Sequence, residues 1–162
     1  MRSFSVDASE IEISIDESQV KFSFEETEII SKLIDGSFPD YRQLIPKKTD
    51  INVVVERDEL VRDVKLAALF AREVGGSITC ETNGTKLLIS AVANELGENT
   101  SEIEVGETEE GKVTLNSRFL LDVLNVIGDE KISFGFSSKV SPVVIKGEKS
   151  KDYLHIIMPM KS

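Results

Sequence analysis

Histidine and cysteine are scarce in this chain of 162 residues, which contains one of each. The single histidine, His155, lies in an apolar stretch, and no neighbouring serine suggests a histidine-based catalytic triad. The sequence has neither the cysteine and histidine spacing of a metal site nor a glycine-rich phosphate loop. We therefore expect no catalytic residue, no metal and no cofactor, and we do not expect an enzyme.

Long apolar runs are missing as well. No apolar stretch approaches about 18 residues, so none is expected to span a membrane. The first residues, Met1–Ser5, lack the apolar core of a signal peptide. Cys80 has no second cysteine with which to form an internal disulfide, and we interpret it as a small strand residue. These features predict a cytoplasmic protein with no membrane partner.

The charge balance is acidic, with a formal net charge of −10 and a pI near 4.7. Binding to nucleic acid needs Lys and Arg side chains that displace counterions from the phosphates. Taken alone, the composition argues against such binding. The argument fails only if the few basic residues gather on one face and the acidic residues lie elsewhere.

Residues 1–46 carry three short patterns of alternating apolar and polar residues, at 10–15, 19–24 and 28–34. Such alternation predicts strands with one apolar face. The pair Asp35-Gly36 ends the third strand with a turn. Since no helix is available to cover the apolar face, we expect either a further segment before residue 1 or packing of this face onto residues 47–162.

Residues 47–162 carry an internal repeat. Residues on its strands and helices match at a constant offset of 60, as in Val53 and Val113, Leu60 and Leu120, and Val64 and Leu124. Each copy of the repeat predicts a strand, a helix and three further strands. The two copies together make one pseudo-symmetric α+β domain. The first copy covers 51–55, helix 57–73, 77–81, 85–91 and 100–106, and the second covers 112–115, helix 117–127, 131–136, 142–146 and 153–158.

Two short segments flank or close this repeat: Phe38-Pro39-Asp40-Tyr41-Arg42, continuing to Pro46, and the apolar tail His155–Ser162 with its Met-Pro-Met sequence. With the repeat between them, they resemble the bacterial sliding clamp, the β subunit of DNA polymerase III. In that family the first segment ends the middle domain and the second closes the chain. The resemblance implies a DNA-clamp fold of two βαβββ repeats, with two helices packed on antiparallel sheets. It assigns 47–162 to a complete C-terminal clamp domain and 1–46 to the last strands of an incomplete middle domain.

The function implied by the resemblance is that of a processivity factor. Such a clamp is a ring-forming dimer that encircles double-stranded DNA without reading its sequence. A hydrophobic groove tethers DNA polymerase, the clamp loader and other proteins with clamp-binding motifs, and a second clamp chain closes the ring. A different interpretation stays open at this point: a free-standing β-rich adaptor that binds peptides and never encircles DNA.

The resemblance also implies where each site lies. Gln43 stands where many clamps carry a basic residue, which puts a charged peptide contact in doubt. For Ile156 and Ile157, packing in the core is as good an interpretation as the groove, because alternation sends one each way. The implied groove residues are Pro39, Leu44, Asn116, Phe119, Val140, Pro142, Ile156, Ile157, Met158, Pro159 and Met160.

Two further surfaces involve the two predicted helices. Arg62, Lys65 and Arg72 fall near one face of the first helix, opposite the apolar residues, and Arg118 lies on the second. The spacing alone favours a solvated face balanced by nearby acidic residues, whereas the resemblance implies loose contact with DNA phosphates. It also places Leu69 and Phe70 at the ring interface, with 100–106 as the adjoining edge strand.

Overall fold

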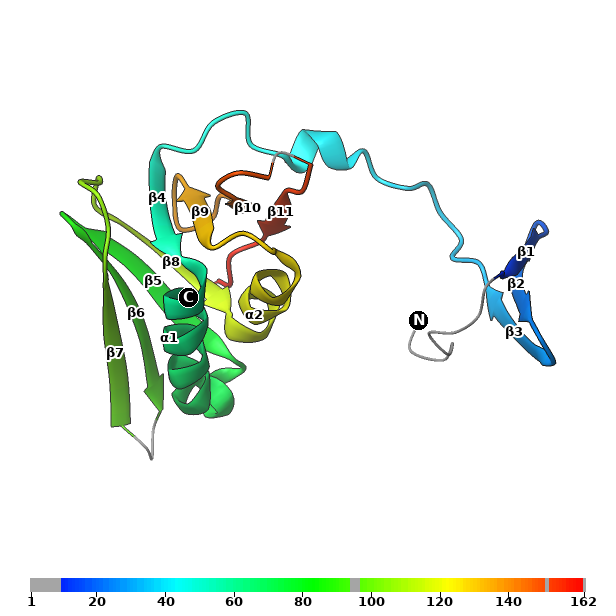
Figure 1. Ribbon diagram of the computed structural model, residues 1–162, viewed down its shortest axis with the longest axis horizontal. Helices are drawn as coiled ribbons and strands as arrows, with labels where there is room; N and C mark the ends of the chain where they lie inside the picture. The colour runs from blue at the N-terminus through cyan, green and yellow to red at the C-terminus, as the bar shows by residue number, and fades with distance from the viewer. Residues whose placement is uncertain (1–9, 94–96, 151, 162) are drawn as a thin grey trace. The chain divides into compact units, whose positions relative to one another are not determined.

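The computed structural model describes residues 10–93, 97–150 and 152–161 (Figure 1). The chain divides into two compact units, with the boundary between Pro39 and Asp40. The second unit contains both helices and all but three of the strands among the described residues. Of these described residues, none belongs to a helix that is both long and apolar enough to cross a membrane.

The first unit is a single antiparallel sheet in the order β1-β2-β3. The strands are β1 (Glu12–Ile15), β2 (Gln19–Phe24) and β3 (Thr27–Lys32), so the three predicted strands are confirmed, the third ending earlier than expected. The Asp16 carboxylate accepts hydrogen bonds from the backbone N–H groups of Ser18 and Gln19, which closes the β1–β2 turn. These hydrogen bonds lower the pKa of Asp16.

One face of this sheet is apolar and largely open. The register places Ile13 opposite Phe22 and Ile15 opposite Val20, so these side chains share a face. Ile13 is 57% exposed and Ile15 70%, whereas Phe24 is the one buried hydrophobic side chain among the described residues of this unit. The predicted lack of cover therefore holds for the isoleucines, in part for Val20 and Phe22, and not for Phe24.

The second unit contains the predicted repeat, with small shifts at the element ends. The helix predicted for 57–73 divides into an α-helix and a short 3-10 helix, η2, and the left-handed conformation of Gly75 ends η2. The elements are η1 (Tyr41–Leu44), β4 (Ile51–Glu56), α1 (Arg57–Phe70), η2 (Ala71–Val74), β5 (Ser77–Asn83), β6 (Lys86–Ala93), β7 (Gly97–Glu104), β8 (Gly111–Asn116), α2 (Ser117–Val126), β9 (Lys131–Phe136), β10 (Val143–Gly147) and β11 (His155–Ile157).

The two repeats exchange their first strands. One sheet has the order β7-β6-β5-β8, and the other has the order β11-β10-β9-β4. Each sheet therefore holds three strands of one repeat and the first strand of the other, all paired antiparallel. Figure 1 shows α1 and α2 side by side against these sheets.

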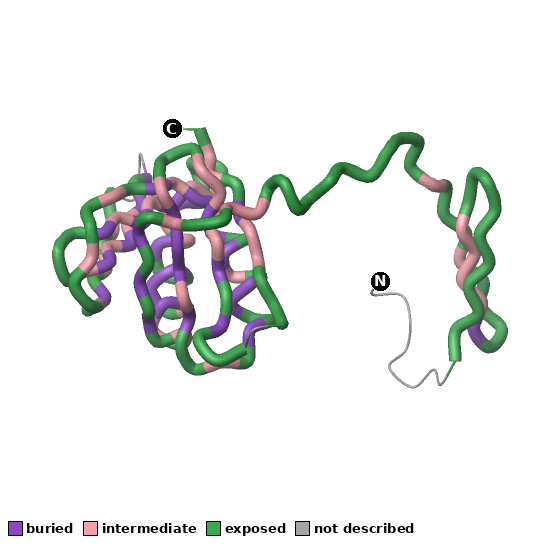
Figure 2. Tube along the Cα trace, turned by 90° about the horizontal axis from the view of Figure 1, so that it is seen from above, coloured by how far each residue is buried: buried purple, intermediate pink, exposed green. Residues whose placement is uncertain are grey.

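The core confirms the offset of 60 between the repeats. Val53 and Val113, and likewise Leu60 and Leu120, are all buried. Figure 2 shows that nearly all of the buried backbone belongs to the second unit. The buried residues of α1 are Leu60, Asp63, Val64 and Ala67, so one charged residue lies among the apolar ones.

Candidate functional site

An apolar pocket of the second unit lies between η1 and the C-terminal tail. It has a volume of 540 Å³. Tyr41, Leu44 and Ile45 form one wall, from residues at and just after η1. Leu154, His155, Ile156 and Met158 form the other, from β11 and the residues that flank it. Two segments far apart in the sequence are therefore brought together.

Asp40 explains why the first wall folds as it does. Its carboxylate accepts hydrogen bonds from the Arg42 N–H and the Gln43 side-chain amide, both at 3.2 Å, and so caps η1. A 3-10 helix places residues three apart on the same side. Tyr41 and Leu44 therefore point the same way, and each is about half exposed. The side-chain amide of Gln43 therefore makes its hydrogen bond within this turn.

The second wall is held at both of its ends. Ile157 is 3% exposed and belongs to the core, while the backbone N–H of Met160 donates to the Thr114 carbonyl at 2.8 Å. Met158, between these anchors, is 59% exposed and lines the pocket. An exposed thioether fixed in this way suits an apolar ligand surface, since methionine adapts its shape to the groups that it contacts.

Three of the predicted groove residues line this pocket: Leu44, Ile156 and Met158. Ile157 is a core residue rather than a groove residue, which decides between the two interpretations left open for it, whereas Ile156 lines the pocket. Pro39 is exposed and belongs to the first unit. The others lie in the second unit but do not line the pocket: Asn116, Phe119, Val140, Pro142, Pro159 and Met160.

Those other residues have distinct surroundings. Asn116 caps α2, with its side-chain oxygen accepting from the Arg118 N–H at 3.0 Å. Phe119 is 56% exposed and Val140 76%, so both present apolar surface to solvent. Pro142, Pro159 and Met160 are half-buried.

Four pocket residues were not predicted: Tyr41, Ile45, Leu154 and His155. Tyr41 and Ile45 lie within the segment that carries the resemblance, and Leu154 and His155 directly precede the predicted tail residues, so proximity in sequence was the available signal. His155 is half-buried, and its Nδ1 lies 3.1 Å from the Tyr153 hydroxyl. The two rings are also stacked, with centroids 6.2 Å apart.

The predicted DNA-facing residues are all exposed or partly exposed, but they differ in their partners. Arg62 forms ion pairs with Asp63 at 3.2 Å and with Glu59 at 3.6 Å. Within the described residues, no ion pair involves Lys65, Arg72 or Arg118. Arg72 lies on η2 rather than α1. Of the four cations, Arg62 alone is therefore neutralised by carboxylates of the described chain.

The predicted ring-interface residues lie at the C-terminal end of α1. Leu69 is 50% exposed, whereas Phe70 is half-buried and packs against the core. The strand predicted at 100–106 is found as β7, and it is an edge strand of its sheet as expected. Leu69 is therefore the more accessible of the two side chains.

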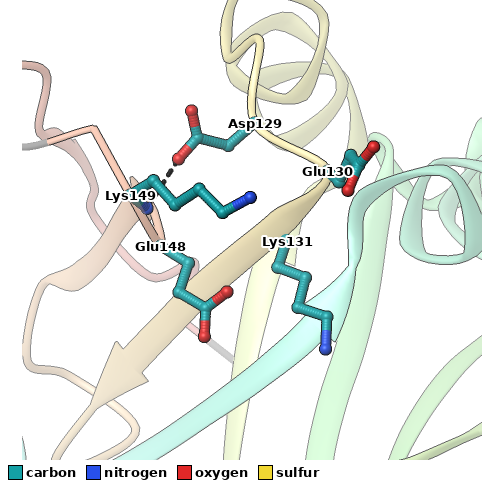
Figure 3. Close-up of a pocket in the computed structure, with 5 residues that line it drawn as sticks. All are labelled: Asp129, Glu130, Lys131, Glu148 and Lys149. Carbon is teal, nitrogen blue, oxygen red and sulfur yellow. Dashed lines mark hydrogen bonds between the residues drawn. The ribbon is translucent and has the colours of Figure 1, made fainter.

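A smaller hollow of 120 Å³ is lined by charged residues of both signs (Figure 3). Asp129 dominates it, because its carboxylate accepts hydrogen bonds from the Lys149 N–H at 2.7 Å and from the backbone and side chain of Ser150. The hydrogen bonds from Ser150 and Lys149 lower the pKa of Asp129. This carboxylate is fully used in holding the β10–β11 loop, so we interpret the hollow as structural.

The part of the chain that the structure describes offers little evidence for a reactive cysteine or a metal site. Cys80 is fully buried in β5, and this burial raises its pKa to about 12, which keeps the thiol protonated. Across residues 10–93, 97–150 and 152–161, no group of three His, Cys, Asp or Glu side chains is placed to hold a metal ion. The interpretation of Cys80 as a strand residue is confirmed.

Comparison with known proteins identifies the family that this arrangement resembles. The family model for the DNA polymerase III beta subunit, C-terminal domain, matches residues 42–161. The beta sliding clamp of Staphylococcus aureus is 25% identical over 136 residues, which cover 82% of this chain and 36% of that protein. The chain therefore spans about a third of the length of the curated relatives that it matches.

Solved structures agree with this match. The DNA polymerase III subunit beta of Pseudomonas aeruginosa has a TM-score of 0.80 and 29% identity, covering 94% of this chain and 42% of that one. The DNA polymerase III beta subunit of Thermotoga maritima has a TM-score of 0.77 and 30% identity, with the same coverage. The expected α+β clamp fold and the resemblance inferred from sequence are both confirmed.

Proposed function

This chain belongs to the DNA polymerase III beta subunit family, to whose C-terminal domain residues 42–161 correspond, and on this premise we propose that it forms the partner-binding part of a replicative sliding clamp. In this proposal, residues 47–162 are the complete C-terminal clamp domain and residues 1–46 are the last strands of a middle domain. The protein acts in the cytoplasm by tethering and performs no catalysis itself.

The pocket between η1 and the tail is the observation that carries the proposal. Its lining is apolar apart from the polar groups of Tyr41 and His155, and Leu44 and Met158 are more than half exposed in it. Exposed apolar side chains gathered in a hollow mark a site for a ligand or a partner. The ligand we propose is a short peptide of the Gln-Leu type, carried by DNA polymerase, the clamp loader or another clamp-binding protein.

In the proposed clamp, residues of the two helical segments would contact DNA and a second clamp chain. Lys65, Arg72 and Arg118 are cations without ion pairs among the described residues, which suits loose contact with DNA phosphates. Leu69, at the end of α1, would contact a second clamp chain together with β7. DNA would be retained by encirclement, so tight binding by these residues is not required.

A peptide titration tests the proposed pocket. A fluorescein-labelled Gln-Leu peptide should bind the full chain with a dissociation constant of about 10–100 μM, because the cost of ordering the peptide offsets much of the contact energy. Replacing Leu44→Ala or Met158→Ala should weaken binding about 5- to 30-fold, since each removes apolar area from a wall of the pocket.

Val92→Ala is the matched control for these variants. Val92 is 60% exposed on β6 and does not line the pocket, so its replacement should leave the dissociation constant unchanged. Peptide binding that is equal in the wild type, Leu44→Ala and Met158→Ala would contradict the assignment of the site.

A further inference from the structure

Met158 is the most exposed of the sulfur-containing residues that the structure describes. Its side chain is 59% exposed, whereas Met160 is half-buried and Cys80 is fully buried. Burial keeps Cys80 as a protonated thiol, the form that reacts poorly with peroxides. The remaining methionine, Met1, lies outside the described residues. Among the described sulfur atoms, an oxidant in solution therefore reaches that of Met158 most readily.

The segment around Met158 holds this side chain at the pocket. On one side of it, Ile157 is anchored in the core, with 3% of its side chain exposed. On the other side, the backbone N–H of Met160 donates to the Thr114 carbonyl at 2.8 Å. Pro159 lies between Met158 and this second anchor, and its ring fixes its own φ. The segment therefore has little freedom to turn a modified Met158 away from the pocket.

Peroxide oxidises a thioether in one two-electron step. A lone pair of the sulfur forms a bond to one peroxide oxygen and the O–O bond breaks. The other oxygen leaves as hydroxide, which takes up the proton of the transferred hydroxyl group and becomes water. The sulfur is oxidised by two electrons and the peroxide is reduced by two. The product, methionine sulfoxide, is polar and reversible by enzymatic reduction.

The sulfoxide oxygen changes what the pocket wall can contact. It is a hydrogen-bond acceptor that water solvates in the free chain and that an apolar partner would strip of water. The pocket offers few donors in exchange, because Tyr41 and His155 have the only polar side chains among its lining residues. Oxidation therefore opposes binding of an apolar anchor against Met158.

From these observations we propose that Met158 is a site of reversible oxidation that regulates the pocket: the thioether form binds the apolar anchors of a partner peptide, and the sulfoxide form releases them. This proposal rests on the proposed function. Because Met158 is not part of the buried core, the oxidised domain keeps its fold. Methionine sulfoxide reductases, each of which acts on one epimer at sulfur, restore the thioether.

Mild treatment of the full chain with hydrogen peroxide, followed by removal of the oxidant, tests the site. Mass spectrometry with fragmentation of the C-terminal peptide should find sulfoxide at Met158 before Met160. A fluorescein-labelled Gln-Leu peptide that contains neither Met nor Cys should then bind about 3- to 20-fold more weakly, as expected when a polar group is buried without a full set of partners. Reductase treatment should restore the original dissociation constant.

Two variants show which methionine is responsible. Met158→Leu has an apolar side chain of similar size that peroxide does not oxidise. Whatever its starting affinity, this variant should bind the peptide equally before and after treatment. Met160→Leu should lose affinity on treatment as the wild type does, because Met160 does not line the pocket. Circular dichroism of each treated protein checks that the fold is retained.

The outcomes distinguish this proposal from the proposed function. Oxidation of Met160 before Met158, unchanged affinity after oxidation of Met158, or an equal loss of affinity in Met158→Leu would each overturn the role of Met158 while the pocket assignment stands. Loss of the native circular dichroism spectrum on oxidation would also overturn it, because unfolding would then account for the lost affinity. If the untreated chain does not bind the peptide, the proposed function fails and this proposal fails with it.

Discussion

Gly147 and Asp129 show how single residues shape the second wall of the pocket. Asp129 holds the loop after β10 through the backbone of Lys149 and both donors of Ser150. Gly147 makes this possible, because a Cβ at that position would collide with the Asp129 carboxylate. The same loop leads into Leu154, the first residue of that wall.

Gly147→Ala should therefore lower the free energy of unfolding by about 1–3 kcal/mol, which is typical of a side chain forced into a packed site. Chemical denaturation followed by circular dichroism measures the change. Gly128→Ala is the control, because a Cβ there meets nothing within 4 Å, and its effect should stay within about 0.5 kcal/mol.

An Asp129→Ala background provides the sharper check. Without that carboxylate only the contact at 3.1 Å to the Cβ of residue 129 remains, so Gly147→Ala should cost less than in the wild type. An unchanged cost in both backgrounds would show that the collision with Asp129 is not the cause.

At the residue scale, the sequence predicted part of the pocket. Leu44 and Met158 were expected in the groove from the resemblance to the clamp family, and alternation predicted that Ile156 and Ile157 point to opposite sides without saying which side each takes. His155 was missed as a pocket residue because strand alternation does not show which side chain faces a distant segment. Asp63, one of the acidic residues near the predicted basic face, is only 6% exposed.

At the scale of helices and strands, the prediction from sequence was close. Alternation located β2 and β9 with the bounds that the structure has, since period-two patterns report directly on strands with one buried face. The pairing of β4 with β9 and of β5 with β8 was not predicted. Alternation tells which face of a strand is buried but not which strand lies beside it.

The repeat makes a prediction for the two helices. Leu60 on α1 and Leu120 on α2 are both fully buried at equivalent positions. Leu60→Ala and Leu120→Ala should each lower the free energy of unfolding by about 2–5 kcal/mol, because each leaves a cavity in the shared core. Urea denaturation followed by circular dichroism measures both.

Leu69→Ala is the comparison on the same helix, because Leu69 is 50% exposed and its truncation leaves no closed cavity. Its cost should be below about 1 kcal/mol. A large loss for Leu60→Ala with none for Leu120→Ala would mean that the repeats do not share one core.

At the scale of the whole molecule, the net charge bears on the proposed contact with DNA. The net charge of −10 repels a polyanion at long range, and the four basic residues of the helical region attract it only locally. The proposed ring retains DNA by encirclement, which makes strong attraction unnecessary.

We therefore expect no stable complex between this chain and a linear duplex at about physiological salt. Fluorescence anisotropy of a labelled duplex measures this, and titration at low salt should reveal only weak binding that salt abolishes. Tight, salt-resistant binding to linear DNA would contradict the clamp proposal for this chain. The adaptor interpretation predicts no binding even at low salt.

The exchange of β4 and β8 has a consequence for the integrity of the second unit. Each repeat completes its sheet with the first strand of the other, so neither repeat has a full sheet by itself. A chain divided between β7 and β8 would leave two pieces that each lack one strand, and neither piece is expected to fold alone. Asp63 and Val123, which the offset of 60 relates, are both buried, although one is charged and the other apolar.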